Sequence, residues 1–374
     1  YLSDSNTDWM QGLKALKSWQ EATGIRFRYA GPEGYVGLAA YDLDYDPLPS
    51  TRYNPEPTFD PAFVPQPGDY VISAHAINGL GVADPDNYAW FRYHQPDDVI
   101  AHVLFYYHVD PLPEDAKTWL VQCAQPVAPL DEATIETRFG PAEPRRLVLP
   151  CEESWVYPGG GSTPGWYALH DQLLHPMGWL ARLRPRPAPQ TGDRFFDRHL
   201  SDFSLTYRQT TYRRQPAFAL FAWDGRTTPR PSVVAHYSAP ASVPPRELAE
   251  APPISDSAVF TGPLTFLGAS AYLTEDTADV RTWWRVTDGP LERPLSIMAH
   301  LVTAEGEAVV LDDGLGFPPS QWQAGDIIVQ RHQFAAQKAG TWLRTGVYWL
   351  DTGERWRLQD APAHDAIFVP LQRE

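Results

Sequence analysis

The chain has 374 residues, of which 43% are hydrophobic and 20% are charged, so it can bury a substantial core and is not disordered as a whole. At roughly 100–200 residues per domain, this length predicts two or three domains. The formal net charge of −16 argues against a surface that binds nucleic acid or an anionic membrane, and no apolar run reaches the roughly 18 residues that a membrane-spanning helix needs.

The opening segment combines a polar cluster with an amphipathic helix. Small polar and acidic residues occupy positions 3–8. A helix is predicted to follow from side chains at helical spacing and from a glycine that can end it: Trp9, Leu13, Leu16, Gln20 and Gly24. Asn6 or Thr7 would cap this helix, with Asp8 in its first turn, where the helix dipole favours a negative charge. Such a polar junction is also typical of ligand sites in α/β proteins, although a well-capped helix alone would explain it.

Strands and helices alternate up to about residue 112, which predicts a first α/β domain over residues 1–112. Strands are predicted over 25–31, at the start of 69–80 and over 98–109, and a helix is predicted over 84–95. The stretch 98–109 is apolar nearly throughout, as expected for a strand in a sheet that is covered on both faces. The alternation therefore predicts a Rossmann-like, open and mostly parallel sheet with helices on its faces.

Three further regions follow. Residues 113–228 continue as a second α/β region, whose continuity with the first is left open, and include a helix capped by Asp131. Residues 229–257 are rich in Pro, Ala and Ser and are predicted to form a semi-rigid linker. Residues 258–374 contain short strands between turn residues, which predicts a β-sandwich. Its expected strands are 262–268, 280–286, 295–302, 307–312, 326–334, 341–350, 355–358 and 366–371.

Only two cysteines occur, Cys123 and Cys151. A disulfide between them is plausible outside the cytoplasm and would be rare inside it. The sequence does not supply the distance between the two Cα atoms, so the bridged and the free states both stay open.

Two clusters suggest chemistry without completing a motif. Asp42, Asp44 and Asp46 have the alternate spacing of a calcium loop, but Pro47 stands where such a loop needs glycine. We therefore predict neither a metal site nor a cofactor. His75 lies at the end of a predicted strand, where a parallel sheet would bring it near the polar opening segment.

Tryptophans of the C-terminal region could stack on sugars, because the faces of both kinds of ring are apolar. Six of them fall in this region: Trp283, Trp284, Trp322, Trp342, Trp349 and Trp356. Neighbouring strand residues face opposite ways, so one of Trp283 and Trp284 is expected in the core. A hydrolase built on Ser162, Glu152 and His170 lacks the Gly-x-Ser-x-Gly turn that would support it.

Four stretches occur in the order found in one protein family: SNTDWMQGLKAL, YAGPEGYVGL, PGDYVISAHAINGL and YAWFRYHQPDDVIAHVLFYYHV. Over most of residues 1–110 the chain resembles bacterial polytopic membrane glycosyltransferases of the dolichyl-phosphate-mannose–protein mannosyltransferase type. In these enzymes a soluble region follows the last membrane helix. The matching opening positions are Ser5, Asn6, Asp8, Trp9, Gln11, Leu13 and Lys14. The sequence departs from the pattern at Met10, where glycine is expected, and at His75, where a small hydroxyl residue is expected.

This resemblance implies the soluble extracytoplasmic tail of such an enzyme, at the face of a bacterial cell membrane and next to its own membrane-embedded domain. The missing initiator Met fits a fragment or a processed product. Transfer of sugar from a lipid-phosphate-linked donor would occur in the membrane-embedded part, and the tail would bind or position a carbohydrate or lipid-linked sugar. The predicted ligand-binding residues are Asn6, Asp8, Trp9, Gln11 and His75, and no catalytic residue is predicted in this chain.

Two other functions stay open. A free-standing carbohydrate-binding protein would need exposed aromatic rings on the C-terminal β-region. A soluble hydrolase or transferase using Asp4, Asp8 and His75 would need these three side chains to converge in a pocket.

Overall fold

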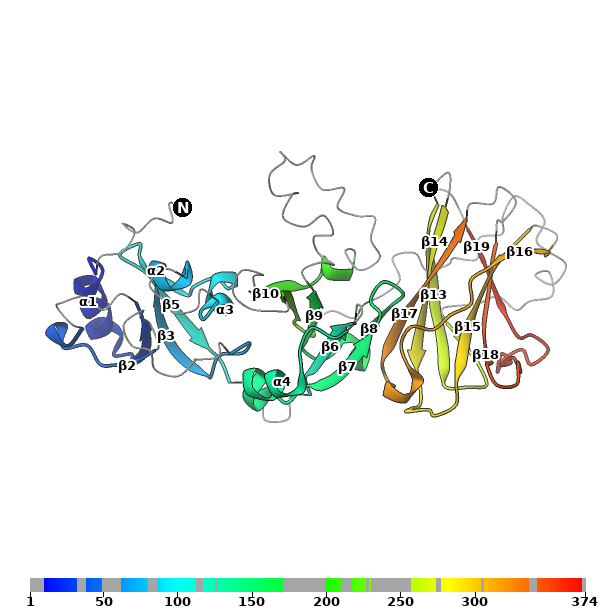
Figure 1. Cartoon of the computed structure of the whole chain (residues 1–374), viewed down its shortest axis with the longest axis horizontal. Coiled ribbons are helices and arrows are strands. Elements are labelled where there is room, and N and C mark those ends of the chain that lie inside the picture. Colours follow the sequence, from blue (N-terminus) through cyan, green and yellow to red (C-terminus); the bar gives the residue numbers. More distant parts are fainter. Residues whose placement is uncertain are drawn as a thin grey trace.

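Figure 1 shows the computed structural model of the chain, in which three sheet-bearing parts follow one another in chain order along the longest axis. The structure describes these residues: 10–31, 38–48, 62–79, 86–111, 117–124, 127–170, 199–209, 217–226, 229, 257–273, 277–303, 306–335 and 342–371. Within these ranges, every helix is too short or too polar to cross a membrane. Short 3₁₀ turns accompany the main elements: η1 (Leu38–Tyr41), η2 (Gly140–Ala142), η3 (Pro158–Gly161) and η5 (Pro319–Gln321).

The N-terminal sheet is mixed rather than mostly parallel. Its strand order is β2 (Tyr45–Pro47), β1 (Phe27–Ala30), β3 (Gly68–Ser73), β5 (Leu104–Val109) and β4 (Asp98–Ile100). β1 is parallel to both β2 and β3, whereas β5 is antiparallel to β3 and β4. The expectation of mostly parallel strands is wrong for this sheet, because a tight hairpin adds its last two strands.

Helices cover both faces of this sheet, as predicted. α1 (Leu13–Thr23) buries Leu13 and Leu16 against one face, together with Phe27 and Val71. The other face carries α2 (Ala74–Ile77) and α3 (Ala89–Tyr93), whose Ala76 and Phe91 pack with the next residues along the strands: Ala30, Tyr70 and Ile72. Alternate strand residues thus supply two separate apolar layers.

The start of α1 differs from the prediction, whereas its end agrees. The N-cap is Gly12, without a side-chain cap bond, so a cap at Asn6 or Thr7 is wrong for α1; both of these residues lie outside the described part of the chain. Met10 has a φ of 69°, which no right-handed helix can contain. This is the position at which the family pattern has glycine, the residue that tolerates such a φ. At the other end Gly24 has a φ of 71°, and its N–H donates to the Gln20 carbonyl.

The predicted single strand over 98–109 is a hairpin. Its turn has Ala101 at φ 51° and His102 at φ 64°, and the Val103 N–H donates to the Ile100 carbonyl at 3.3 Å. Two consecutive positive φ values define a type I′ turn, which normally carries Asn-Gly. The turn carries Ala-His in place of Asn-Gly, within an otherwise apolar run, so the residue types gave no signal for a hairpin.

The second sheet has the order β10 (Ser204–Gln209), β11 (Phe218–Trp223), β9 (Gly165–His170), β6 (Trp119–Cys123) and β7 (Arg145–Leu149). β6 is parallel to β7 and β9, and the other two pairs are antiparallel. α4 (Glu132–Phe139) begins after Asp131, whose carboxylate accepts from the Thr134 N–H as predicted.

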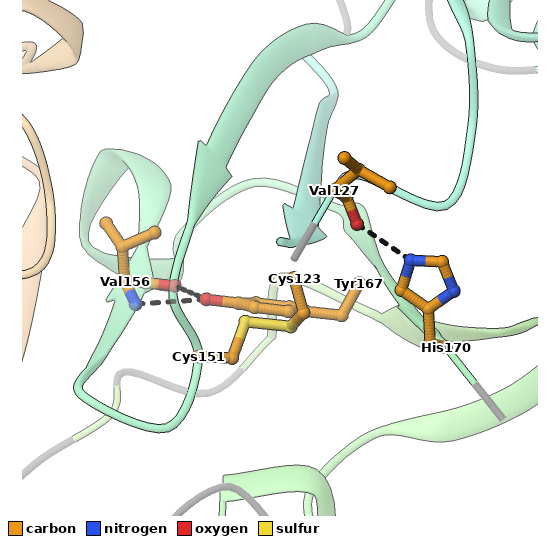
Figure 2. Close-up of a disulfide and its surroundings, with 6 residues drawn as sticks. All are labelled: Cys123, Val127, Cys151, Val156, Tyr167 and His170. Atoms are coloured by element: carbon orange, nitrogen blue, oxygen red, sulfur yellow. Dashed lines mark hydrogen bonds between the residues drawn. A yellow bond between two sulfur atoms is a disulfide. The ribbon is translucent and has the colours of Figure 1, made fainter. Parts of the chain in front are cut away.

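A disulfide joins Cys123 to Cys151, which decides between the two states that the sequence left open. Figure 2 shows this bridge beside Tyr167. The buried Tyr167 hydroxyl accepts from the Val156 N–H at 3.0 Å and donates to the Val156 carbonyl at 2.6 Å. The bridge therefore joins the end of β6, in the second sheet, to the segment just before residues 154–157, which pair with the C-terminal part.

Two antiparallel sheets form the C-terminal part. One has the order β12 (Ala258–Val259), β13 (Leu264–Leu273), β14 (Thr277–Val286), β17 (Ile327–Ala335) and β8 (Ser154–Tyr157). The other has the order β16 (Ala308–Leu311), β15 (Leu295–Val302), β18 (Trp342–Trp349) and β19 (Ile367–Pro370). The predicted strands in this region have observed counterparts, except that 355–358 makes only isolated bridges through Arg355 and Leu358.

β8 ties the second part of the chain to the third. Its residues come from the predicted second region, yet it pairs with β17 as an edge strand of the C-terminal sheet (Figure 1). One hydrophobic core accordingly includes both Trp119 and Trp284. Of the predicted linker over 229–257, residues 230–256 lie outside the described residues.

Candidate functional site

The segments that resemble the glycosyltransferase family meet at one edge of the N-terminal sheet. β1 and β3 are parallel, so their carboxyl ends share this edge. The Ala74 N–H, directly after β3, donates to the Val103 carbonyl at 2.8 Å. A Cβ atom on Gly12 would lie 3.0 Å from both Val103 and Leu104. The start of α1, the start of α2 and the β4–β5 turn therefore adjoin.

The strand order makes this edge a natural place for a ligand. The chain leaves β1 for β2 on one side, and β3 then pairs with β1 on the other side. In open α/β sheets, ligands bind outside the carboxyl ends of neighbouring strands whose connections leave in opposite directions.

Two of the predicted ligand-binding residues can be placed at this edge. Gln11 is exposed beside the N-cap of α1, and His75 is half-buried in α2. The other three, Asn6, Asp8 and Trp9, lie outside the described residues, as does Asp4. The convergence of Asp4, Asp8 and His75 that a hydrolase or transferase requires thus stays a prediction.

His102 is a residue at this edge that the sequence did not single out as a candidate. It is exposed in the β4–β5 turn, directly before Val103. A strand was predicted through this position, so the turn was hidden.

A histidine–carboxylate pair lies at the opposite edge of the same sheet. Asp69 accepts from the Tyr106 hydroxyl at 2.7 Å and lies 2.8 Å from His108 Nδ1. The hydrogen bond with Asp69 raises the pKa of His108 above its ordinary value. Burial alone would raise the pKa of Asp69, but the hydrogen bonds from His108 and Tyr106 outweigh burial and lower it. Neither Gln11 nor His75 belongs to this cluster.

The acids over 42–46 are paired with cations. Arg26 contacts the carboxylates of Asp44 at 3.3 Å and Asp46 at 2.6 Å, and Lys17 lies 3.7 Å from Asp42. Within the described residues no group of three or more His, Cys, Asp or Glu side chains could hold a metal ion. The triple acid is explained by ion pairing.

The imagined Ser162–His170 hydrolase gains no support. His170 Nε2 donates to the Val127 carbonyl at 2.7 Å (Figure 2), and the Ser162 hydroxyl donates to the Gly159 carbonyl at 2.7 Å. Each side chain is thus engaged with the backbone, and no contact joins the two.

The C-terminal tryptophans do not form a broad flat platform. Five of the six are buried, with exposed fractions of 6% or less: Trp283, Trp284, Trp322, Trp342 and Trp356. Trp349 is half-buried. Both members of the Trp283–Trp284 pair lie in the core, so the prediction that one is in the core is met and neither is available for stacking.

Trp349 lines a surface hollow of about 710 Å³ at the end of β18. Polar side chains surround it: Thr261, Glu354, Arg355, Arg357 and Asp365. In the extended segment after the turn at 350–353, alternation exposes Arg355 and Arg357 and buries Trp356 beneath them. A Cβ atom on Gly262 would lie 2.5 Å from the Trp356 ring, so glycine allows this close packing.

Hydrogen bonds and ring contacts hold the hollow in shape. The guanidinium of Arg293 lies 4.3 Å from the centroid of the Trp349 ring and donates to both carboxylate oxygens of Asp351. Trp356 meets Trp349 edge-on, with 5.0 Å between ring centroids. The Thr261 N–H and hydroxyl bond the Arg357 backbone at 2.8 and 3.1 Å. Arg293 and Trp356 thereby hold Trp349 in place beside the polar side chains of the hollow.

Comparison with protein-family models, with curated proteins and with solved structures finds no match for this chain.

Proposed function

We propose that the chain is a non-catalytic, saccharide-recognising extracytoplasmic region of a membrane glycosyltransferase that uses a lipid-phosphate-linked sugar. The observation that carries saccharide recognition is the hollow beside Trp349. There a half-buried indole lies next to planar charged side chains on fixed backbone, including Arg355 and Asp365. Sugar-binding sites need these two kinds of group, an apolar ring for the sugar face and convergent hydrogen-bonding groups for its hydroxyls.

Two observations support the placement in a membrane glycosyltransferase. The motifs of that family resemblance lead to one sheet edge, where the ends of β1 and β3 adjoin the starts of α1 and α2. The Cys123–Cys151 disulfide fits an oxidising compartment outside the cytoplasm. In this proposal the N-terminal sheet is a Rossmann-like domain whose edge faces the membrane-embedded part. The two C-terminal sheets are a β-sandwich that presents the hollow.

Calorimetric titration of the whole chain with neutral and acidic oligosaccharides tests saccharide recognition. We expect saturable binding that Trp349→Ala weakens about tenfold or more, because it removes the only described half-buried tryptophan of the C-terminal sheets. Leu350→Ala is the matched control, since Leu350 is the next residue and 55% exposed. Unchanged binding in the Trp349 variant would place recognition elsewhere on the chain.

A free-standing carbohydrate-binding protein is the second candidate, and the same hollow favours it. This candidate requires exposed aromatic rings, and among the described tryptophans of the C-terminal sheets only the half-buried Trp349 can supply one. The gene sequence upstream of Tyr1 separates the two candidates. Membrane-spanning segments encoded there would support the glycosyltransferase assignment, and a start codon near Tyr1 would contradict it.

A further inference from the structure

The arginines around the Trp349 hollow outnumber the carboxylates that neutralise them. Three carboxylates belong to the hollow and its rim: Asp351, Glu354 and Asp365. Four arginines lie on it or donate to these carboxylates: Arg293, Arg344, Arg355 and Arg357. This balance contrasts with the net charge of −16 for the chain.

Asp365 is shared between two guanidinium groups. Arg344 donates to one of its oxygens and Arg355 donates to the other, each at 3.3 Å. Charge-assisted bonds between guanidinium and carboxylate are usually 2.7–2.9 Å long, so a single acid satisfies neither cation fully. A guanidinium has five N–H donors, and among the described residues Arg355 uses one of them on Asp365, so the others can meet a ligand.

The positive charge of Arg357 is neutralised even less than that of Arg355. Its guanidinium donates to the Ala363 carbonyl at 3.4 Å and reaches no carboxylate among the described residues. It faces the same side as Arg355, since two positions separate them along an extended segment. The two cations therefore form an anion-accepting pair on the hollow that Trp349 lines.

We infer that the hollow takes a saccharide bearing an acidic substituent, a carboxylate or a phosphate, which Arg355 and Arg357 bind while the sugar ring lies against Trp349. This inference rests on the proposed saccharide recognition and narrows its ligand class. Glu354 is an acceptor in the same hollow, suited to sugar hydroxyls.

Titration of the whole chain with three probes tests the inference: neutral mannotetraose, tetragalacturonic acid and mannose 1-phosphate. We expect at least one acidic probe to bind about tenfold or more tighter than the neutral probe, with an affinity that falls as salt is raised. A preference for the uronate or for the phosphate identifies the acidic group.

The double variant Arg355→Gln/Arg357→Gln should remove this preference, because glutamine keeps hydrogen-bond donors in the hollow but removes both positive charges. Arg26→Gln is the control, because Arg26 is an exposed arginine directly before β1 that is paired with Asp46. Equal affinities for neutral and acidic probes, or a preference that survives the double variant, would overturn the acidic-ligand inference alone. Absence of binding by all three probes would overturn saccharide recognition as well.

Discussion

Arg145 and Asp326 form a two-pronged ion pair across 181 positions of the chain, with both N–O distances at 2.8 Å. Arg145 begins β7 of the second sheet, whereas Asp326 directly precedes β17 and is fully buried. The Asp326 carboxylate also accepts from the Gly159 and Gln323 N–H groups. Arg145 additionally donates to the Gln321 carbonyl. This network connects the same two parts of the chain that β8 joins.

Asp326→Asn should lower the free energy of unfolding by about 3–5 kcal/mol, because it leaves the Arg145 guanidinium largely buried without its counter-charge. Urea denaturation followed by tryptophan fluorescence measures the change. Asp46→Asn is the control, since it breaks an exposed pair with Arg26 and should cost less than about 1 kcal/mol. Equal losses in the two variants would contradict a structural role for the buried pair.

Removing the disulfide should destabilise the protein. Cys123 and Cys151 are 28 positions apart, and closing a loop of that length in the unfolded chain is worth about 3–4 kcal/mol. We expect reduction, or the double change to Ser, to lower the urea midpoint correspondingly. Reductant should not change the urea midpoint of the double variant. A wild-type urea midpoint that is the same with and without reductant would contradict the prediction.

The β4–β5 turn offers a stabilising substitution. Ala101 and His102 both have positive φ values and exposed side chains, so Ala101→Asn with His102→Gly relieves strain without removing packing. The double variant should gain about 1–2 kcal/mol in unfolding free energy. Lys14→Gly, within α1, should instead lose about 1 kcal/mol, because its backbone is helical. A loss in the turn variant would mean that Ala101 and His102 make contacts that outweigh the strain.

The pKa shifts of His108 and Asp69 predict the pH range in which their interaction stabilises the fold. The raised pKa of His108 means that its share of stability is complete below about pH 6.5 and is lost as pH rises through the folded pKa. The lowered pKa of Asp69 means that its share is present above about pH 4 and is lost as pH falls through the folded pKa. The pair is therefore strongest between about pH 4 and 6.5. NMR titration of His108 should show its pKa fall in Asp69→Asn, and an unchanged value would contradict the pairing.

Local patterns predicted the C-terminal strands well. The segment 295–302 coincides with β15, and most other boundaries there differ by one to three residues, because each strand alternates or runs apolar between turn residues. The helix over 84–95 is shorter in the structure, where α3 spans Ala89–Tyr93. The cap at Asp131 and the end of α1 at Gly24 also followed from residue type.

Features that depend on contacts between residues far apart in the sequence could not be predicted from local patterns. Nothing in the residues of β8 indicates that it pairs with β17, because the pairing depends on the fold of both parts. The turn at Ala101 and His102 has residues that do not favour it, so the strands on either side impose it. The sequence named Trp349 only as one of six candidate tryptophans and did not predict the hollow. Which ring is available for a ligand depends on burial, which the sequence does not give.

The position of β8 also dictates an order of events on the ribosome. β6, β7 and β9 can pair with one another once residue 170 has emerged, but β8 has no partner strand until residue 335 has been made. During that interval Trp155 and Val156, both fully buried in the finished fold, lack the C-terminal sheet that β8 joins. Unpaired apolar strands invite association between nascent chains. Synthesis that pauses between these two points should favour aggregation and create a need for a chaperone.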